Sequence, residues 1–100
     1  MKISELMTNY ENYLNKDIEV QGWMRNLRAS KNVAFIELND GTTFNDVQVV
    51  MGTNLNNFDE ISKLGLYSSI KVKGTVVLNN NQGIEIQATE IHTLGISDKD

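Results

Sequence analysis

The sequence predicts an all-β domain, a five-stranded barrel that carries two short helices. Apolar residues recur at every second position in five separate segments, which is the spacing that half-buried strands require. Glycines interrupt two of the longest segments, and such glycines suit the strong bending of strands in a small closed barrel. The chain has 100 residues, of which 40% are hydrophobic, so we expect one domain with one modest core.

Composition excludes several classes of protein. The chain contains no cysteine, which rules out a disulfide framework and a thiolate metal site. No apolar run approaches the roughly 20 residues that a membrane span needs, and the polar N-terminal stretch lacks the apolar centre of a signal peptide. We therefore expect a soluble, cytoplasmic protein with no membrane partner.

The net charge of −4 by itself argues against a nucleic-acid partner. The positive charges are clustered, however. Arg25 and Arg28 are the only arginines, and Lys31 follows them closely in the sequence. A local basic strip on an acidic domain is therefore compatible with the composition, as is an ordinary surface of mixed charge.

The N-terminal segment predicts a helix over residues 4–14, with Ser4 as its N-cap. The apolar residues at helical spacing are Ile3, Leu6, Met7, Tyr10 and Leu14. From residue 18 the period changes to two, which predicts a first strand over residues 18–25 with Trp23 and Arg25 facing outward. Gly22 in its middle indicates a bend or a bulge.

Residues 28–32, "RASKN", are expected to connect this strand to a second one at 33–38, in which Phe35 and Glu37 face outward. Asp40-Gly41 marks a turn over residues 39–46. A third strand follows at 47–51, with Gln48 outward. Apolar residues at 55, 58, 61 and 64 then predict a helix of about ten residues that ends before Gly65.

The fourth strand is expected at 69–78, with Leu78 inward and Lys71 and Lys73 on a solvated face. Residues 79–83 form a hairpin loop, the fifth strand covers 84–91 with Glu85 outward, and a polar tail starts at His92. Three strands, a helix and two strands is the order of the OB-fold, a five-stranded Greek-key barrel. Another small mixed barrel and an open α+β sheet are the alternatives.

The outward residues suggest a binding face. OB-folds bind oligonucleotides over strands two and three, and single-stranded bases are held by aromatic platforms and a few polar groups. Phe35 would stack on a base, Gln48 can donate and accept, and Glu85 can only accept a hydrogen bond. Arg25 and Arg28 would hold phosphate or stack on a base.

Each of these assignments has an ordinary alternative. Phe35 can simply cover a neighbouring side chain such as Trp23, and the polar residues are common on any outward strand face. The same face could also serve a protein-interaction or oligomerisation module, or a nonspecific single-strand binder. Catalysis finds no support, because the chain has one histidine, no nucleophilic cysteine and no phosphate-binding glycine loop.

One stretch carries a family likeness: "GWMRNLRASKNVAFIELNDGTTFNDVQVV", residues 22–50. It resembles the N-terminal anticodon-binding domain of class II aminoacyl-tRNA synthetases for aspartate, asparagine and lysine. The shared skeleton is a Gly-Trp-x-Arg strand, an arginine near the turn, a Phe-Ile-acid strand, an Asp-Gly turn and a later glutamine. "LRASK", "FIELNDG" and "TFND" are most similar to the asparaginyl version, and the likeness continues through "VKGTVV" and "GIEIQATEIHTLG".

The resemblance implies roles for particular residues. Phe35 matches the phenylalanine that stacks on the central anticodon uridine, and Gln48 matches the glutamine that reads that uridine. Arg28 and Glu85 match further anticodon contacts. One departure is Ala29, which stands where the family often has an acidic residue, so a contact from that position is not expected here.

The resemblance also implies a parent enzyme. Residues 1–100 would be the anticodon-binding domain of an asparagine–tRNA ligase, with the anticodon loop of tRNA(Asn) as partner. The parent would be a homodimer that uses ATP and Mg²⁺, whereas this fragment would hold no cofactor and would not be catalytic. Arg25 and Lys31 are possible contacts to the RNA backbone. An aspartyl- or lysyl-tRNA synthetase is the alternative within the family.

Overall fold

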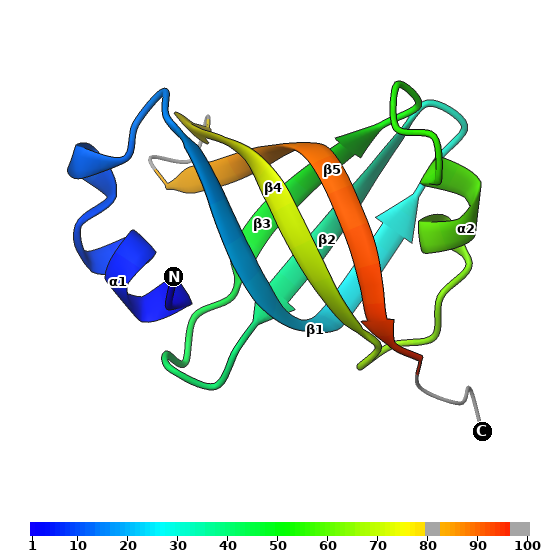
Figure 1. Ribbon diagram of the computed structural model, residues 1–100, viewed down its shortest axis with the longest axis horizontal. Coiled ribbons are helices and arrows are strands. Elements are labelled where there is room, and N and C mark those ends of the chain that lie inside the picture. The colour runs from blue at the N-terminus through cyan, green and yellow to red at the C-terminus, as the bar shows by residue number, and fades with distance from the viewer. Residues whose placement is uncertain (80–82, 97–100) are drawn as a thin grey trace.

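The computed structural model describes residues 1–79 and 83–96 and forms a closed five-stranded barrel (Figure 1). The order around the barrel is β1-β2-β3-β5-β4. The strands are β1 (Asp17–Ala29), β2 (Val33–Asn39), β3 (Val47–Gly52), β4 (Ser69–Leu78) and β5 (Ile84–Gly95). The β3–β5 pair is parallel and the other pairs are antiparallel. The predicted OB-fold is confirmed.

The core fills the inside of the barrel with the inward side chains of all five strands. Ile36, Leu38, Val49, Val72 and Ile86 are fully buried, as period two predicts. Each such side chain contributes about 1.5–3 kcal/mol through burial. Leu78 is the exception among the expected inward residues. It is 56% exposed because it lies at the end of β4.

Two helices close opposite ends of the barrel (Figure 1). They are α1 (Ile3–Thr8), which is followed by the 3-10 turn η1 (Tyr10–Asn12), and α2 (Phe58–Ser62). Both predicted helices were too long. The segments "TNYEN" and "TNLNN" flank them, and Asn and Thr side chains favour turns over helix interiors. Helices this short depend on packing for their stability, and each buries two apolar residues against the barrel.

The N-terminus of α1 is capped by a loop far away in the sequence, so the predicted cap at Ser4 was wrong. The helix starts at Ile3, whose amide donates to the Asp40 carboxylate at 2.9 Å. The amide of Ser4 donates to the Thr42 hydroxyl at 3.0 Å. Asp40 and Thr42 belong to the loop between β2 and β3, residues 40–46, and they therefore fasten α1 to the barrel.

Strand β1 serves both sides of the barrel. Its first half pairs with β4 and its second half with β2, and the change occurs at Trp23. A Cβ at Gly22 would lie 2.3 Å from the Asn39 carbonyl oxygen, so the crossing needs a glycine. The irregularity expected at Gly22 appears slightly later, as a register shift between Met24 and Asn26. Arg25 is the extra residue of this bulge.

The C-terminal part of β5 was not predicted. Thr89 is extra in the pairing with β4, because Ala88 pairs with Gly74 and Glu90 with Lys73. This bulge moves the alternation by one residue, so the segment from His92 looks like a tail although it pairs with β4 up to Gly95. Residues 80–82 of the expected hairpin loop and 97–100 of the expected tail lie outside the described residues. No helix in the described ranges is long and apolar enough to cross a membrane.

Candidate nucleic-acid interface

The outer face of β1, β2, β3 and β5 carries two neighbouring rows of side chains in matching register. The first row consists of Arg28, Phe35, Val50 and Gln87. The second row consists of Asn26, Glu37, Gln48 and Glu85. We call these eight residues the binding face. It brings together four strands and includes the four residues that the sequence singled out for the anticodon.

Arg28 reaches this face because of the bulge in β1. It lies within the strand and not in the connection where the sequence placed it. Arg25 and Arg28 are three positions apart, so an unbroken strand would turn them to opposite faces. The extra residue at Arg25 changes the phase, and both arginines are exposed while Leu27 packs partly against the core.

Phe35 is half-buried, and the charged side chain of Arg28 lies beside its ring. The guanidinium carbon of Arg28 lies 5.8 Å from the centroid of the Phe35 ring, which is within the range of a cation–π interaction. The two residues are also cross-strand partners. Trp23 instead pairs with Asn39, so the alternative in which Phe35 covers Trp23 across the strand pair does not describe this structure.

Gln48 and Glu85 are neighbours across the parallel β3–β5 pair. Both are half-buried. In residues 1–79 and 83–96, neither side chain forms a hydrogen bond or an ion pair with another described residue. Glu37 faces Gln48 from β2. An amide flanked by two carboxylates offers mainly acceptors, which suits the amino and ring N–H groups of nucleobases.

Sequence reasoning missed half of the binding face. Glu37 was placed outward but was not connected with a site, and Gln87 was not singled out, since only the register shows which strands are neighbours. Val50 was not considered because it is apolar. Asn26 follows the outward residue Arg25 directly, so unbroken alternation turns it inward. The bulge between Met24 and Asn26 could not be located from the sequence.

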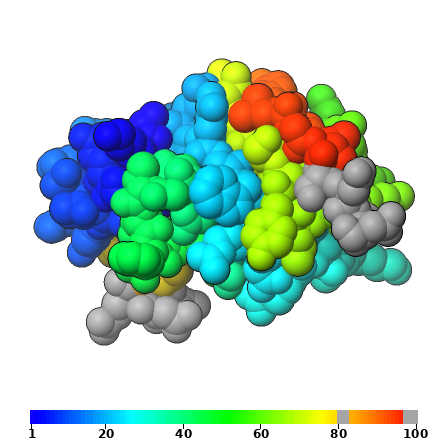
Figure 2. Space-filling view, turned by 90° about the horizontal axis from the view of Figure 1, so that it is seen from below, coloured from blue at the N-terminus to red at the C-terminus, as the bar shows by residue number. Residues whose placement is uncertain are grey.

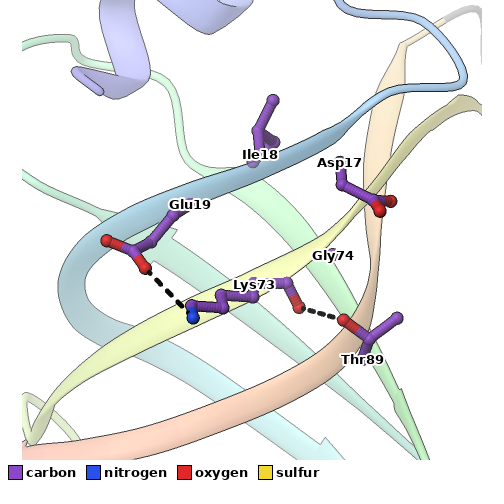
Figure 3. A pocket seen from close by; sticks show the side chains of 6 residues that line it. All are labelled: Asp17, Ile18, Glu19, Lys73, Gly74 and Thr89. Carbon is purple, nitrogen blue, oxygen red and sulfur yellow. Dashed lines mark hydrogen bonds and ion pairs between the residues drawn. The ribbon is translucent and has the colours of Figure 1, made fainter.

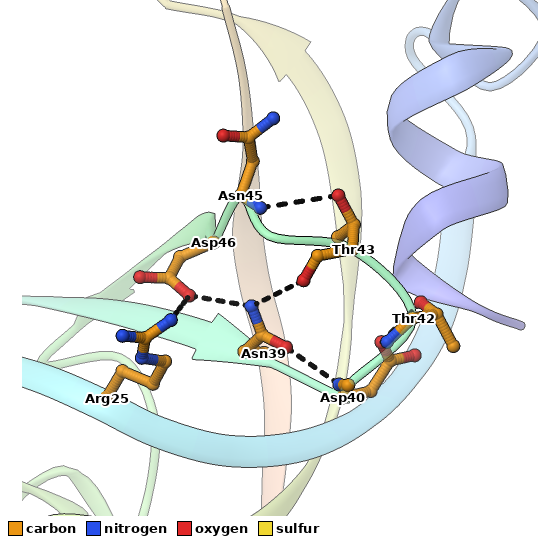
Figure 4. A network of polar contacts seen from close by, with 8 residues as sticks. Arg25, Asn39, Asp40, Thr42, Thr43, Asn45 and Asp46 are labelled. Atoms are coloured by element: carbon orange, nitrogen blue, oxygen red, sulfur yellow. Dashed lines mark hydrogen bonds and ion pairs between the residues drawn. The ribbon is translucent and has the colours of Figure 1, made fainter.

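A third row, made of Arg25, Asn39 and Asp46, continues the face toward the β2–β3 loop, and Figure 4 shows the polar contacts of these residues. Arg25 forms an ion pair with Asp46 at 3.5 Å. Asn39, only 3% exposed, donates from Nδ2 to the same carboxylate at 2.9 Å and to the Thr43 carbonyl at 3.1 Å. Its Oδ1 accepts from the Gly41 amide at 2.7 Å. The buried amide of Asn39 therefore holds both ends of the loop in place.

The Asp40 carboxylate fixes the other side of this loop. Its Oδ1 accepts hydrogen bonds from the Thr42 amide at 3.0 Å and from the Thr42 hydroxyl, and its Oδ2 accepts from the Ile3 amide. Partial burial raises the pKa of Asp40, but these hydrogen bonds outweigh burial and leave the pKa below its ordinary value. Gly41 follows with a φ of 83°, the left-handed region in which glycine is favoured.

Lys31 lies at the other end of the face. It is exposed in the turn between β1 and β2. Two hydrogen bonds close this turn, because the Ser30 amide and the Ser30 hydroxyl both donate to the Val33 carbonyl. Arg25, Arg28 and Lys31 thus follow one another along the edge that β1 and this turn form. The predicted cations share one edge of the face, although Arg25 is partly neutralised by Asp46.

The opposite side of the barrel carries a shallow pocket over β1, β4 and β5 (Figure 3). Lys73 is engaged there by two carboxylates, Glu19 at 3.8 Å and Glu90 at 3.7 Å. His92 and Lys73 hold the pKa of Glu90 below its usual range. This matches the solvated face expected for Lys73. In the described part of the chain, no group of three acidic or histidine side chains could hold a metal ion.

Comparisons with known proteins agree with this architecture. The family model described as "tRNA_anti-codon: OB-fold nucleic acid binding domain" matches residues 18–94. The asparagine–tRNA ligase of Clostridium tetani is 45% identical over 100% of this chain and 22% of its own length. That of Bacillus cereus is 46% identical over 98% of the chain and 22% of its own length. This chain thus spans about a fifth of these relatives.

A solved structure shows the same fold at lower similarity. The asparaginyl-tRNA synthetase from Pyrococcus horikoshii, complexed with asparaginyl-adenylate, is 21% identical and superposes with a TM-score of 0.84. The match covers 100% of this chain and 23% of the synthetase chain. At this identity the likeness bears on the fold, and the family model supplies the assignment. The chain belongs to the tRNA anti-codon family of OB-fold nucleic acid binding domains.

Proposed function

We propose that this chain is the anticodon-binding domain of an asparagine–tRNA ligase and binds the anticodon loop of tRNA(Asn). Family membership and the names of the relatives at 45–46% identity support the proposal. One observation carries it. Arg28, Phe35, Gln48 and Glu85 come from four different strands, yet they occupy two adjacent rows on one face.

In this proposal the central uridine of the anticodon stacks on Phe35. A base stacked on an aromatic side chain contributes about 1–3 kcal/mol to binding. The Arg28 guanidinium lies beside the ring in the free protein, and it moves to a phosphate or to the far side of the base when the base arrives. The cation–π contact thus holds Phe35 and Arg28 close to the positions that RNA binding requires, so little free energy is needed to arrange them when RNA binds.

The edge of the same uridine meets Gln48. A uracil ring presents one N–H donor between two carbonyl acceptors, and an amide can both accept from the donor and donate to a carbonyl. Cytosine replaces this pattern with an amino donor and a ring acceptor, so the two matched hydrogen bonds with the Gln48 amide are lost. Glu85 only accepts and takes an amino or ring N–H group of a neighbouring base. Arg25 and Lys31 contact the RNA backbone.

The reaction of the parent enzyme is part of the proposal. Residues 1–100 form the anticodon-binding domain, and the ligase activity in protein biosynthesis resides in the rest of the parent. The relatives, of which this chain spans 22%, are named as ligases for asparagine and tRNA. The parent uses ATP and Mg²⁺, acts as a homodimer and works in the cytoplasm, while this domain selects the RNA.

The direct test is an NMR titration of the ¹⁵N-labelled chain with a short RNA stem-loop. One stem-loop carries the anticodon GUU, and the matched control changes only the central uridine to cytidine. We expect amide shifts at Arg28, Phe35, Gln48 and Glu85 that are clearly weaker with the control. Shifts elsewhere, or equal shifts with both loops, would contradict the proposal. Equal binding of a GUC loop would favour the aspartyl alternative.

Phe35→Ala tests the stacking step. We expect affinity for the GUU stem-loop to fall by about 5- to 150-fold, which corresponds to about 1–3 kcal/mol. Leu94→Ala is the control, because it removes an exposed apolar side chain, 52% exposed, near the far end of β5. Thermal unfolding of both variants should remain cooperative. Loss of the cooperative transition in Phe35→Ala would make Phe35 a structural residue.

A protein-binding module is the competing function for the same face. Each protein contact to a phosphate of single-stranded RNA contributes about −0.7 to the slope of log affinity against log salt concentration. We expect a slope that corresponds to two or three contacts, as Arg25, Arg28 and Lys31 provide. Tight binding of a protein together with no measurable affinity for RNA at low salt would favour the competing function.

A further inference from the structure

Phe44 is the most exposed large hydrophobic residue among those that the structure describes. Its exposure is 100%, whereas the other exposed apolar side chains in the described ranges lie between 45% and 72%. It sits in the β2–β3 loop, which lies against α1 and beside the light-blue part of β1 on the surface (Figure 2). A single exposed apolar side chain is common on protein surfaces, so Phe44 becomes a candidate contact only through its surroundings.

The loop that presents Phe44 is held by specific contacts. Asn39 and Asp46 tie its two ends to each other (Figure 4), and Asp40 ties it to α1 through the Ile3 amide. Next to Phe44, the Asn45 amide donates to the Thr43 hydroxyl at 3.3 Å. The backbone on both sides of the ring is therefore fixed. The backbone that carries the ring therefore loses little conformational entropy when a ligand binds, which is the advantage of preorganisation.

The surroundings of Phe44 suit a nucleobase better than a protein. A surface depression next to the ring is lined by Arg25, Asn39, Gly41, Thr42 and Thr43 together with Phe44. Apart from the ring its side chains are polar or cationic, so the depression lacks the further apolar groups that make up the centre of a protein interface. Aromatic rings with a neighbouring arginine are the usual platform for unpaired bases.

The depression is continuous with the binding face. Arg25 precedes Asn26, which belongs to the second row, and Asp46 is two residues before Gln48 in the same row. The Arg25–Asp46 ion pair bridges β1 and the start of β3 at this edge. An RNA strand that leaves Phe35 over Gln48 therefore meets the third row next and then the Phe44 ring.

We infer that Phe44 is a second stacking platform, which holds an unpaired base of the same RNA loop beyond the base on Phe35. The inference rests on the proposed function and extends it, because it assigns to the β2–β3 loop a contact with a base outside the Phe35 position. Arg25 lies beside this base and supplies the positive charge for its phosphate.

The test measures, by fluorescence anisotropy, the binding of a labelled GUU stem-loop to the unaltered 100-residue chain and to four variants of it. Phe44→Ala should weaken binding by about 5- to 150-fold, the range expected for one lost stacked base. Phe44→Trp should keep the affinity, because indole stacks at least as well. Phe35→Ala is the positive control, and Leu94→Ala is the control for an exposed apolar residue remote from the loop.

A second measurement identifies the base. Stem-loops with 2-aminopurine at successive loop positions lose fluorescence where the probe stacks. The central uridine, which Gln48 reads, is kept in every probe. We expect Phe44→Ala to restore fluorescence at one of the other loop positions, and Phe35→Ala at saturating protein concentration to leave the probe at that position quenched. Urea unfolding of Phe44→Ala should match that of the unaltered chain, since the side chain is wholly exposed.

The outcomes separate the two proposals. If Phe35→Ala weakens binding and Phe44→Ala does not, the second platform is wrong and the proposed function stands. If neither variant changes the affinity, the proposed function is wrong as well. If Phe44→Ala leaves RNA binding intact but abolishes self-association of the chain, the ring serves a protein contact and the inference is overturned.

Discussion

Replacing Asn39 by alanine should destabilise the whole domain, although the residue lies next to a surface loop. Asn39 is 3% exposed and forms three hydrogen bonds, to the Asp46 carboxylate, the Thr43 carbonyl and the Gly41 amide. These bonds close the β2–β3 loop, and this loop also caps α1 through Asp40. The substitution therefore affects the loop, the helix and the attachment of both to the barrel.

The magnitude follows from the contacts. An intramolecular hydrogen bond contributes about 0.5–1.5 kcal/mol, so three bonds correspond to roughly 1.5–4.5 kcal/mol. Water can reach the loop once it loosens and can satisfy part of the freed backbone. We therefore expect the free energy of unfolding of Asn39→Ala to fall by about 2–3 kcal/mol. For a domain of this size, the melting temperature should fall by roughly 8–24 °C.

The assay is urea unfolding followed by tryptophan fluorescence. Trp23 is the only tryptophan, and a Cβ at Gly41 would lie 3.3 Å from its indole, so the indole lies against the loop. Asn45→Ala is the matched control, because it removes the same side chain from an exposed position in the same loop. It should change stability by less than about 0.5 kcal/mol. Equal urea midpoints for the two variants would refute the reasoning.

Three further predictions concern the barrel. Gly22→Ala should destabilise by about 1–3 kcal/mol, because its Cβ would lie 2.3 Å from a β2 carbonyl oxygen. Gly83→Ala, whose Cβ would have no neighbour closer than 3.5 Å, should be nearly neutral in the same urea assay. The pKa of Asp40 is lower in the folded chain than its ordinary value of 3.8. The ionised carboxylate therefore stabilises the fold above pH 3.8, and this stabilisation is lost as the pH falls through the pKa of the folded state. Asp40→Asn should thus reduce the pH dependence of the urea midpoint below pH 3.8. Lys73→Gln should alter stability by less than about 1 kcal/mol despite two ion pairs, because both are exposed.

Period-two alternation was a reliable guide wherever a strand was regular. It put Ala34, Ile36 and Leu38 inside, and Phe35 and Gln48 outside, and the structure agrees. The hydrophobic effect acts on each strand in the same way, so the buried face of a strand is visible in its sequence as apolar residues at every second position. The order of three strands, a helix and two strands indicated the OB-fold, and the structure decided against the other small mixed barrel and the open sheet.

Alternation failed at a bulge in β1 and at a bulge in β5. One extra residue at Arg25 or at Thr89 reverses the direction of the side chains that follow it, up to the next irregularity of the strand. The length of β5 and the position of Arg28 were misjudged for this reason. A bulge is fixed by the pairing of two strands, so neither strand alone contains the information.

The sequence by itself determined the fold class and the inward faces of the regular strands. It also singled out Phe35 as a candidate stacking residue, because an aromatic side chain stands there among polar outward neighbours. Only the tertiary structure decided which residues are neighbours. It set Gln48 beside Glu85 through a parallel pair, and it joined the cap of α1 to Asp40, 37 positions away. Local sequence encodes which side of a strand is buried, but the closure of the barrel decides which outward residues share a face.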